Sequence, residues 1–293
     1  MVKINNNLKS VDPLVTVAMP IYNAGKYLRP AVLSIMQQTL TDWELYIIDD
    51  GSTDDALSYI ADVQDSRIII IKDGQNKGLA ARLNEVINLA KGRYFARMDQ
   101  DDFSYPDRLL KQVDVLEVNL DLDLLATRAI KISMEGEPVG YLPFSLSHAE
   151  ITAAPWRGFY MPHPTWMGRL QWFKKNHYAE PAPYLSEDQE LLLRTFEESN
   201  FACLEEVCLA YRVRDGVGFS KLVKIRYHQL CIQLSYARNK KLINFALLAI
   251  SFFILKVMND CYTKIFRIKY APHAVGDIDG KELIRFKQLP INF

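Results

Sequence analysis

The sequence predicts an α/β fold, with a mostly parallel, doubly wound sheet followed by a helical C-terminal extension. Short apolar runs rich in β-branched residues alternate with amphipathic helical patterns as far as residue 118. Polar clusters directly follow three of these runs. Alternating strands and helices favour parallel pairing, and ligands bind such sheets beyond the carboxyl ends of the strands. The three clusters are therefore expected to converge on one edge of the sheet.

Each predicted strand of the first half is a short apolar run, and each predicted helix repeats apolar residues every three or four positions. Gly92 suits the position just after a helix, where glycine is common because it tolerates a positive φ. The predicted strands are residues 14–19, 45–48, 67–71 and 94–98, and the predicted helices are residues 27–38, 53–60, 78–90 and 106–118.

The second half is less regular, and residues 120–185 combine short strands with Pro, Gly and many aromatic residues. A helix is predicted over 186–198, strands over 203–204 and 207–213, and helical structure from about residue 221. A chain of 293 residues is long enough for one large α/β domain with an extension. The predicted division is an α/β domain over 1–218 and a helical C-terminal extension over 219–293.

Charge and cysteine content exclude several classes of protein. The chain balances 35 basic against 35 acidic residues, so no strongly basic half indicates nucleic-acid binding. Its four cysteines form neither a CxxC pair nor a Cys/His cluster with zinc spacing, which predicts free thiols in a reducing compartment. The N-terminal segment lacks the apolar core of a signal peptide. We expect a cytoplasmic protein without a nucleic-acid partner.

The sequence Asp99-Gln100-Asp101 follows the fourth predicted strand. Carboxylates two positions apart in an extended turn can reach the same side, and oxygen ligands suit Mg²⁺ or Mn²⁺, which also bind phosphate oxygens. Such a metal would neutralise a departing diphosphate. The alternative is an acidic loop that caps the next helix, but the position at a strand end, beside two other polar clusters, favours the metal.

The other strand-end clusters are Asp49-Asp50-Gly51-Ser52 and Pro20-Ile21-Tyr22-Asn23. The first offers a carboxylate to a base or ribose, and the second offers an aromatic face to a base. A turn with an N-cap and a core tyrosine are the respective alternatives. Farther along, Gly78 precedes a helix that carries Arg82, an arrangement that suits a diphosphate or, alternatively, a basic surface helix.

Glu187 and Asp188 open a predicted helix. Either carboxylate could act as a general base toward an acceptor hydroxyl, or both could simply interact with the helix dipole. His163 lies between Pro162 and Pro164, which fix the backbone of its loop as a binding site would need. A structural role is the alternative for this histidine.

These segments together resemble the inverting family-2 glycosyltransferases of bacterial polysaccharide and lipopolysaccharide synthesis, which have the Rossmann-like GT-A fold. The resemblance covers about residues 13–215, and the ordered set of segments is what makes it specific. The chain lacks the QxxRW motif of processive polysaccharide synthases, which favours the addition of a single sugar. The matching segments are VTVAMPIYNAGKYL, WELYIIDDGSTDD, NKGLAARLN, KGRYFARMDQDD with YPDRL, HPTWMGR and SEDQELLLR.

The resemblance implies roles for the residues on the donor side. Pro20, Tyr22 and Asp50 would contact the nucleoside of a nucleoside-diphosphate-sugar. Arg82 would lie near the diphosphate of this donor, and Arg212 is a further basic group that could face it. Residues 1–218 would then form the catalytic domain.

The resemblance also implies a metal site and a catalytic base. Asp101 would bind Mn²⁺ or Mg²⁺, with Asp99 beside it and nearer the ribose. Asp188 would be the base that activates the acceptor hydroxyl. Glu187 and His163 would lie on the acceptor side.

The implied activity is transfer of a sugar, with a UDP-sugar favoured, to a hydroxyl of a saccharide or lipid-linked acceptor with inversion. A sugar nucleotidyltransferase is one alternative, although the first turn, PIYNAGKY, lacks the expected glycine-rich basic signature. A non-catalytic subunit that binds nucleotide-sugars is another, against which the presence of both acidic pairs argues.

Residues 242–258 form an apolar run, LINFALLAISFFILKVM. It is short for a spanning helix, which needs about 20 residues. A helix packed on the catalytic domain, a helix in the membrane interface and a true span are the three arrangements considered. Interfacial attachment would place the protein peripherally at the inner face of the cell membrane, near a lipid-linked acceptor. The flanking basic residues are Arg238, Lys240, Lys241, Lys264, Arg267 and Lys269.

Overall fold

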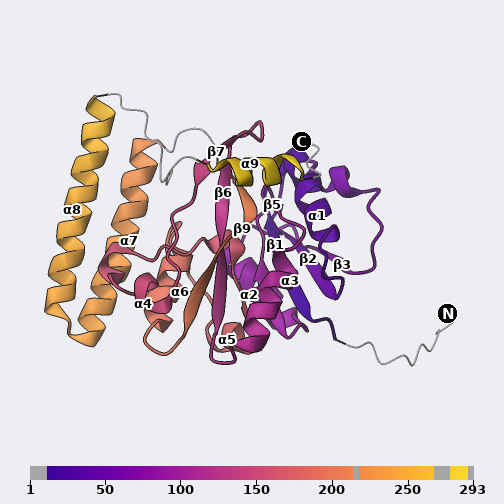
Figure 1. Ribbon diagram of the computed structural model, residues 1–293. Helices are drawn as coiled ribbons and strands as arrows, with labels where there is room; N and C mark the ends of the chain where they lie inside the picture. The colour runs from indigo at the N-terminus through magenta and orange to yellow at the C-terminus, as the bar shows by residue number, and fades with distance from the viewer. Residues whose placement is uncertain (1–11, 214–217, 267–277, 290–293) are drawn as a thin grey trace.

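The computed structural model describes residues 12–213, 218–266 and 278–289 (Figure 1). One sheet is covered by helices on both faces. The strands are β1 (Val15–Ile21), β2 (Trp43–Asp49), β3 (Ile68–Lys72), β4 (Tyr94–Arg97), β5 (Phe103–Ser104), β6 (Leu124–Ile132), β7 (Pro138–Tyr141), β8 (Met167–Arg169) and β9 (Phe201–Arg212). The α-helices are α1 (Leu28–Met36), α2 (Leu79–Leu89), α3 (Arg108–Val118), α4 (His148–Ile151), α5 (Leu170–Lys175), α6 (Glu187–Thr195), α7 (Phe219–Lys240), α8 (Ile243–Ile265) and α9 (Gly280–Lys287). Short 3₁₀ helices are η1 (Gly25–Tyr27), η2 (Ala56–Ile60), η3 (Pro155–Arg157) and η4 (His163–Thr165).

The strand order is β3-β2-β1-β4-β8-β6-β9-β5, with β7 paired to β6. The first four strands in this order are parallel, as the sequence predicts. Beyond β4 the sheet is mixed, because β8 runs antiparallel to both β4 and β6 whereas β6 and β9 are parallel. The chain passes from β1 to β2 and β3 and then returns to β4 on the other side of β1. This creates a switch point between the carboxyl ends of β1 and β4, where open α/β sheets bind ligands.

Alternate residues of the central strands face two apolar layers. On one face, Ala18 and Ile48 belong to a core that includes residues of α2, α5 and α6. On the other face, Val17 and Ile47 belong to a core that includes residues of α1 and α3. Because both faces of the parallel strands are covered, apolar residues occupy nearly every position, which explains the continuous apolar runs in the sequence.

Two predicted elements differ from those in the structure. Residues 56–60 form a 3₁₀ helix rather than the α-helix predicted over 53–60. The two strands predicted over 203–204 and 207–213 are one strand, β9, with a shift in register against β6. Glu205 and Glu206 are both exposed at this irregularity, so the alternation of buried and exposed residues is interrupted while the strand continues.

The C-terminal extension is helical, as predicted, and Figure 1 shows α7 and α8 side by side at one edge of the molecule. The last helix, α9, returns to the sheet. Its Phe286 shares a core cluster with Phe103 and Tyr105, and Arg285 forms an ion pair of 2.9 Å with Asp107. Through these contacts of Phe286 and Arg285, the extension packs on the α/β part of the chain.

Candidate active site

A cavity of about 590 Å³ lies at the switch point. The structure brings all three strand-end clusters to this cavity, although they are far apart in the sequence. Its lining comes from the ends of β1, β2, β4, β6, β7 and β9 and from the first turns of α2 and α7. The polar and charged residues that line it are Tyr22, Asp50, Arg97, Asp99, Gln100, Asp101, Lys131, Tyr211, Arg212 and Lys221, together with Pro20.

Hydrogen bonds connect the turn after β1 to residues 99–102 after β4, which we call the acidic turn. The backbone N–H of Tyr22 donates to Oε1 of Gln100 at 2.6 Å, and Nε2 of Gln100 donates back to the Tyr22 carbonyl at 3.1 Å. The Tyr22 side chain is 47% exposed, which excludes the alternative of a core tyrosine. Gln100 thus fixes the distance between the two turns and leaves Tyr22 at the rim of the cavity.

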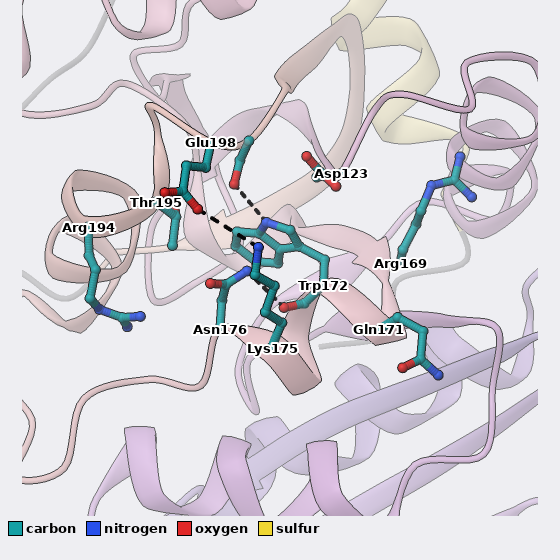
Figure 2. A pocket seen from close by; sticks show the side chains of 10 residues that line it. Asp123, Arg169, Gln171, Trp172, Lys175, Asn176, Arg194, Thr195 and Glu198 are labelled. Carbon is teal, nitrogen blue, oxygen red and sulfur yellow. Dashed lines mark hydrogen bonds and ion pairs between the residues drawn. The ribbon is translucent and has the colours of Figure 1, made fainter.

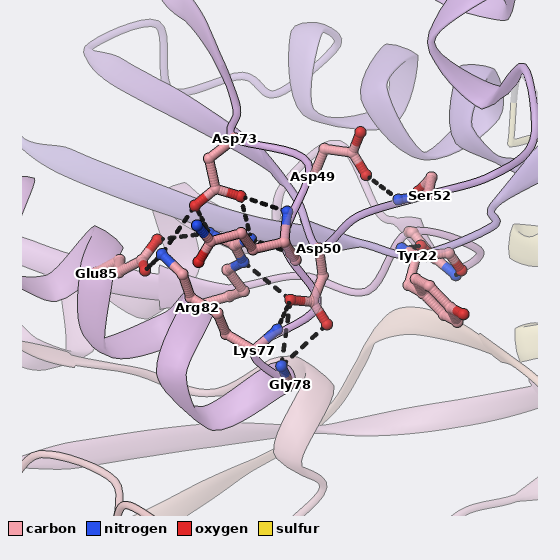
Figure 3. Close-up of polar contacts among 11 residues, drawn as sticks. Tyr22, Asp49, Asp50, Ser52, Asp73, Lys77, Gly78, Arg82 and Glu85 are labelled. Carbon is pink, nitrogen blue, oxygen red and sulfur yellow. Dashed lines mark hydrogen bonds and ion pairs between the residues drawn. The ribbon is translucent and has the colours of Figure 1, made fainter.

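Asp50 is held by a dense set of donors (Figure 3). Its Oδ1 accepts from the Lys77 backbone N–H at 2.7 Å and from Nε of Arg82 at 2.9 Å. Its Oδ2 accepts from the Gly78 backbone N–H at 3.0 Å. The turn that follows Asp50 requires glycine, because Gly51 has a φ of +75° and an added Cβ would lie 2.9 Å from the Gln75 carbonyl carbon. The carboxylate is therefore fixed in orientation before any ligand binds.

Arg82, which is predicted to lie near a diphosphate, is not among the residues that line the cavity. It is fully buried, and its remaining donors meet Asp73 at 2.6 and 3.0 Å, Glu85 at 2.8 Å and the Gln75 carbonyl. Helix α2 turns this side chain toward three carboxylates, those of Asp50, Asp73 and Glu85 (Figure 3). Arg82 orients Asp50 instead.

Arg97 ends β4 as a buried cation in the wall of the cavity. It is 4% exposed, and its Nη2 lies 2.5 Å from Oδ1 of Asp99. Among the described residues, its buried Nε and Nη1 have no hydrogen-bond partner. A buried donor without a partner is costly, and such groups call for an explanation such as a ligand. The sequence analysis missed this residue, although a charged residue within the apolar run YFARM was a visible signal.

Arg212, at the end of β9, supports the acidic turn through hydrogen bonds. Asp102 is buried, and its Oδ1 accepts from the Arg212 backbone N–H at 2.9 Å. Burial, and then the charges of Asp99 and Asp101, raise the pKa of Asp102 well above its usual value. Nε of Arg212 donates to the Asp101 carbonyl at 2.9 Å, so Arg212 both lines the cavity and supports the turn.

Glu187 and Asp188 lie in the first turn of α6. Nε2 of Gln189 donates to Oδ2 of Asp188 at 3.0 Å, and Gln189 is itself held by both backbone groups of Phe159 at 2.8 and 3.2 Å. Burial, and then the charge of Asp188, raise the pKa of Glu187 to about 7. Burial also raises the pKa of Asp188, while the charge of Arg97 lowers it. Neither carboxylate lines the cavity, but both interact electrostatically with Arg97 in its wall.

His163 is buried rather than open to solvent. Its Nε2 lies 2.8 Å from the Tyr178 hydroxyl, and its ring packs against Trp166 with centroids 4.5 Å apart. Burial, and then the charge of Arg97, lower its pKa well below the usual value. The histidine is therefore uncharged near neutral pH, and its contacts are those of a side chain that supports the loop.

A second cavity of about 470 Å³ lies at the other end of the sheet (Figure 2). Asp123 lines it just before β6 begins, whereas Lys131 lines the first cavity near the end of the same strand. Side chains of the protein already interact across it, as Trp172 Nε1 donates to Ser199 Oγ at 2.8 Å. None of the residues predicted to bind donor, metal or acceptor lines this cavity. The first cavity is the candidate active site.

The donor set at the acidic turn fits a divalent cation that also binds a phosphate. Asp99 and Asp101 supply carboxylate oxygens at the cavity, which suit Mg²⁺ or Mn²⁺. Within residues 12–213, 218–266 and 278–289, no group of three or more His, Cys, Asp or Glu side chains is arranged to hold a metal ion. A cation here would therefore need oxygens from the substrate or water as its remaining ligands.

The chain is similar to glycosyltransferases in sequence and in fold. The profile of the family described as "Glycosyl transferase family 2" matches residues 16–176. An uncharacterized glycosyltransferase of Methanocaldococcus jannaschii is 32% identical over 236 residues, which cover 78% of this chain and 81% of that protein. An Escherichia coli UDP-Glc:alpha-D-GlcNAc-diphosphoundecaprenol beta-1,3-glucosyltransferase is 33% identical over 108 residues, 37% of this chain and 43% of that protein.

A solved structure has the same fold. The mannosyltransferase of Pyrobaculum calidifontis, determined with GDP-Man and Mn²⁺, matches with a TM-score of 0.62 at 14% identity, over 95% of this chain and 80% of that chain. The predicted GT-A fold class is confirmed. The family profile matches more than half of the chain, in a segment that contains the strand-end clusters around the cavity. The protein therefore belongs to glycosyl transferase family 2.

Proposed function

We propose that the protein transfers a sugar from a nucleoside-diphosphate-sugar, with a UDP-sugar favoured, to a hydroxyl of a saccharide or lipid-linked acceptor with inversion. The process served would be cell-surface polysaccharide synthesis. The strongest support is that Asp50, Asp99 and Asp101 meet in one cavity while Glu187 and Asp188 lie within electrostatic reach of its wall. The E. coli relative acts from UDP-Glc on a diphosphoundecaprenol-linked sugar, which favours this class of donor and acceptor.

On the donor side, we assign the nucleoside to Pro20, Tyr22 and Asp50. The Asp50 carboxylate has about four acceptor positions, and its Oδ2 uses fewer of them than its Oδ1. Oδ2 can therefore still accept a hydrogen bond from a base or ribose. The exposed ring of Tyr22 offers an apolar face at the rim.

We assign a divalent cation, Mn²⁺ or Mg²⁺, to Asp101 and Asp99. When bound, the cation supplies positive charge that stabilises the leaving nucleoside diphosphate. Asp99 pairs with Arg97, which holds this carboxylate in place at the cavity, and we assign Asp101 as the principal ligand. Arg212 and Lys221 are basic residues that line the cavity, and we assign them to the diphosphate.

On the acceptor side, we assign the catalytic base to Asp188. Asp188 takes the proton of the acceptor hydroxyl, and the oxygen attacks the anomeric carbon from the side opposite the diphosphate. The bond from that carbon to the diphosphate oxygen breaks as the new glycosidic bond forms, through an oxocarbenium-like transition state. One displacement inverts the anomeric configuration. Glu187 is the alternative base, and the neutral His163 would support its own loop on the acceptor side.

A donor panel tests this proposal. Purified protein is incubated with UDP-, GDP-, dTDP- and CMP-linked sugars and Mn²⁺, and the released nucleotide is identified. We expect slow release of nucleoside diphosphate from one donor class, loss of this release with a chelator, and an inverted product by NMR. Formation of a nucleoside triphosphate and a sugar-1-phosphate when pyrophosphate is added to the same mixture would instead indicate a nucleotidyltransferase. Binding without any release would indicate a non-catalytic subunit.

The acidic turn is tested with Asp101→Ala, with Asp114→Ala as a matched control. Asp114 is an exposed carboxylate on α3, so its loss should leave activity unchanged. Asp101→Ala should abolish transfer at saturating Mn²⁺. Full activity of Asp101→Ala would reject the assigned metal site.

A further inference from the structure

Helix α8 packs on the rest of the molecule through one face only. Near its start, Phe245 and Ala249 are buried. The Phe245 ring lies 5.3 Å from the ring of Tyr236 on α7 and 6.3 Å from that of Trp156 on η3, measured between centroids. This inward face joins the apolar core that reaches α6.

The other end of α8 is fixed by a buried ion pair. Asp260 is 1% exposed, and its Oδ1 accepts from Nη2 of Arg226 on α7 at 2.7 Å. Because a buried ion pair requires close matching of both partners, α8 is held along α7 near both of its ends. The orientation of its outer face is therefore fixed by the fold.

The outer face of α8 is apolar and open to solvent. Ile243 is 74% exposed, and Leu255 and Met258 are each 63% exposed. The exposed apolar residues recur at intervals of three or four, which places them on one side of a helix about 35 Å long. No exposed residue of α8 from Ile243 to Tyr262 is charged. The exposed apolar residues of this face are Ile243, Leu247, Leu248, Ile250, Ile254, Leu255, Met258, Tyr262 and Ile265.

The helices that carry this face are strongly basic. Residues 219–266 contain eight Lys or Arg and a single Asp. The whole chain balances 35 basic against 35 acidic residues, so the rest of it is net acidic. At a membrane surface, acyl chains would accommodate the apolar face, and anionic headgroups would attract the basic residues of the two helices. Arg267 and Lys269, predicted to flank the apolar run, lie outside the described residues.

The packing of α8 favours a position on a membrane rather than across it. By length and composition alone, Ile243–Ile265 could cross a bilayer. However, its inner face is bound along α7, which contributes Lys221, Lys224, Arg226, Arg238 and Lys240, and charged residues are expensive in the hydrocarbon core. Only the outer face of α8 is free to enter the interface.

We propose that the outer face of α8 docks on the surface of an anionic lipid bilayer, with the basic residues of the α7–α8 pair beside the headgroups. Exposed aliphatic side chains gain free energy by leaving water, and each basic residue near an anionic surface adds electrostatic attraction. Docking of this kind is reversible and depends on salt concentration.

The docked face would also place the cavity beside the membrane. Lys221 of α7 lines the cavity, and Nζ of Lys264 on α8 lies 4.3 Å from the ring centroid of Phe219 in the same turn of α7. The C-terminal end of α8 therefore lies next to the cavity wall. This consequence rests on the proposed function, since it matters only if the acceptor is carried on a lipid.

Vesicle flotation of the full chain tests the docking without any donor sugar. We expect binding to vesicles of phosphatidylcholine with phosphatidylglycerol, weaker binding to phosphatidylcholine alone, and release at high salt. Ile254→Glu combined with Leu255→Glu should weaken binding by about a hundredfold, because two aliphatic contacts are lost and two acidic charges are added. Equal binding of this double variant, or no binding of the native chain to either vesicle, would overturn the proposal.

The matched control is Val118→Glu combined with Leu120→Glu. These residues, 79% and 73% exposed, lie at the end of α3 on the opposite face of the sheet, so this control should still bind vesicles. Transfer to a water-soluble acceptor should be unchanged in both double variants, which separates docking from the proposed function. A native chain that dimerises without lipid, and becomes monomeric in the α8 variant, would instead assign this face to a second copy of the chain.

Discussion

Asp50 and the pair Glu187–Asp188 are carboxylate sites of the same active region, but their surroundings differ. Asp50 accepts hydrogen bonds from two backbone N–H groups and from Arg82, all within 3.0 Å. Asp188 accepts from the side chain of Gln189, and burial together with its charge raises the pKa of Glu187 to about 7. One carboxylate is surrounded by donors, whereas the two adjacent carboxylates oppose each other's charge.

The difference matches the two tasks proposed for these sites. A residue that binds the nucleoside must keep one orientation throughout the reaction, and the donors around Asp50 provide it. A base must take up a proton and release it, which requires a pKa near the working pH. Burial raises the pKa values of both Glu187 and Asp188, and the charge of Asp188 raises the pKa of Glu187 further. Perturbed pKa values of this kind are common at catalytic sites.

Replacing Asp188 with Asn should have the largest effect. We expect transfer to fall by about 10³-fold, within the range of general base catalysis. Donor affinity should change little, because Asp188 does not line the donor cavity. Transfer rates and calorimetric donor binding measure the two quantities separately, with Asp114→Asn as a control. If this variant turns over normally, another residue is the base, and Glu187 would be tested next.

Arg97 connects the two carboxylate sites, and its loss should have the next largest effect. Arg97→Met removes the partner of Asp99 and a cation that lowers the pKa of Glu187 and Asp188. We expect the rate to fall by about 10²-fold, as when one electrostatic donor is removed from an active site, and the rise of activity with pH to move to higher pH.

Arg97→Lys keeps the charge but not the planar fork, so it should restore the native pH dependence and part of the rate. Thermal unfolding of both variants checks that they fold. A folded Arg97→Met with a native pH profile would limit Arg97 to a structural role.

Asp50→Asn should weaken donor binding rather than the chemical step. The amide keeps an acceptor oxygen, but it loses the charge that pairs with Arg82. Hydrogen bonds to charged groups contribute about 1.5–3 kcal/mol, which corresponds to a loss of donor affinity of roughly tenfold or more. Calorimetry with the nucleoside diphosphate measures this loss. If donor binding is native and only the rate falls, Asp50 belongs with the catalytic groups.

The sequence predicted the parallel half of the fold well because covered strands leave a distinct apolar pattern. The convergence of Tyr22, Asp50 and Asp101 followed from topology alone, since the carboxyl ends of parallel strands meet at one edge. The mixed half was less predictable. β8 has three residues, and its antiparallel pairing with β4 depends on contacts distant in the sequence.

Side-chain direction was the part that the sequence could not provide. Arg82 follows a glycine at a helix start, which suits a phosphate site, yet Asp73 and Glu85 surround it from the other side. Arg97 appeared as one charged residue in an apolar run, and only its burial beside Asp99 gives it a role. Both outcomes depend on which carboxylates the fold brings near an arginine.

Glu187→Gln should have the smallest effect on rate and the clearest effect on pH dependence. The charged groups that act on Glu187 are Asp188 on its own helix and Arg97 and Asp99 on β4 and the turn after it. Removing the Glu187 charge should let Asp188 ionise at lower pH, so the rise in kcat/KM should move to lower pH by about one unit. Glu190→Gln, which removes a carboxylate paired with Arg194 on the same helix, is the matched control and should not move it.

The same substitution has a predictable effect on stability. Because the folded pKa of Glu187 is raised, its contribution to stability is present below about pH 4.5 and is lost as the pH rises through about 7. Glu187→Gln should therefore raise the Tm relative to the native protein at pH 8 and change it little at pH 4. If the rise in kcat/KM stays in place while the Tm shifts as expected, Glu187 is buried near Asp188 without tuning it. If Glu187→Gln loses transfer as completely as Asp188→Asn, Glu187 takes part directly in the proton transfer.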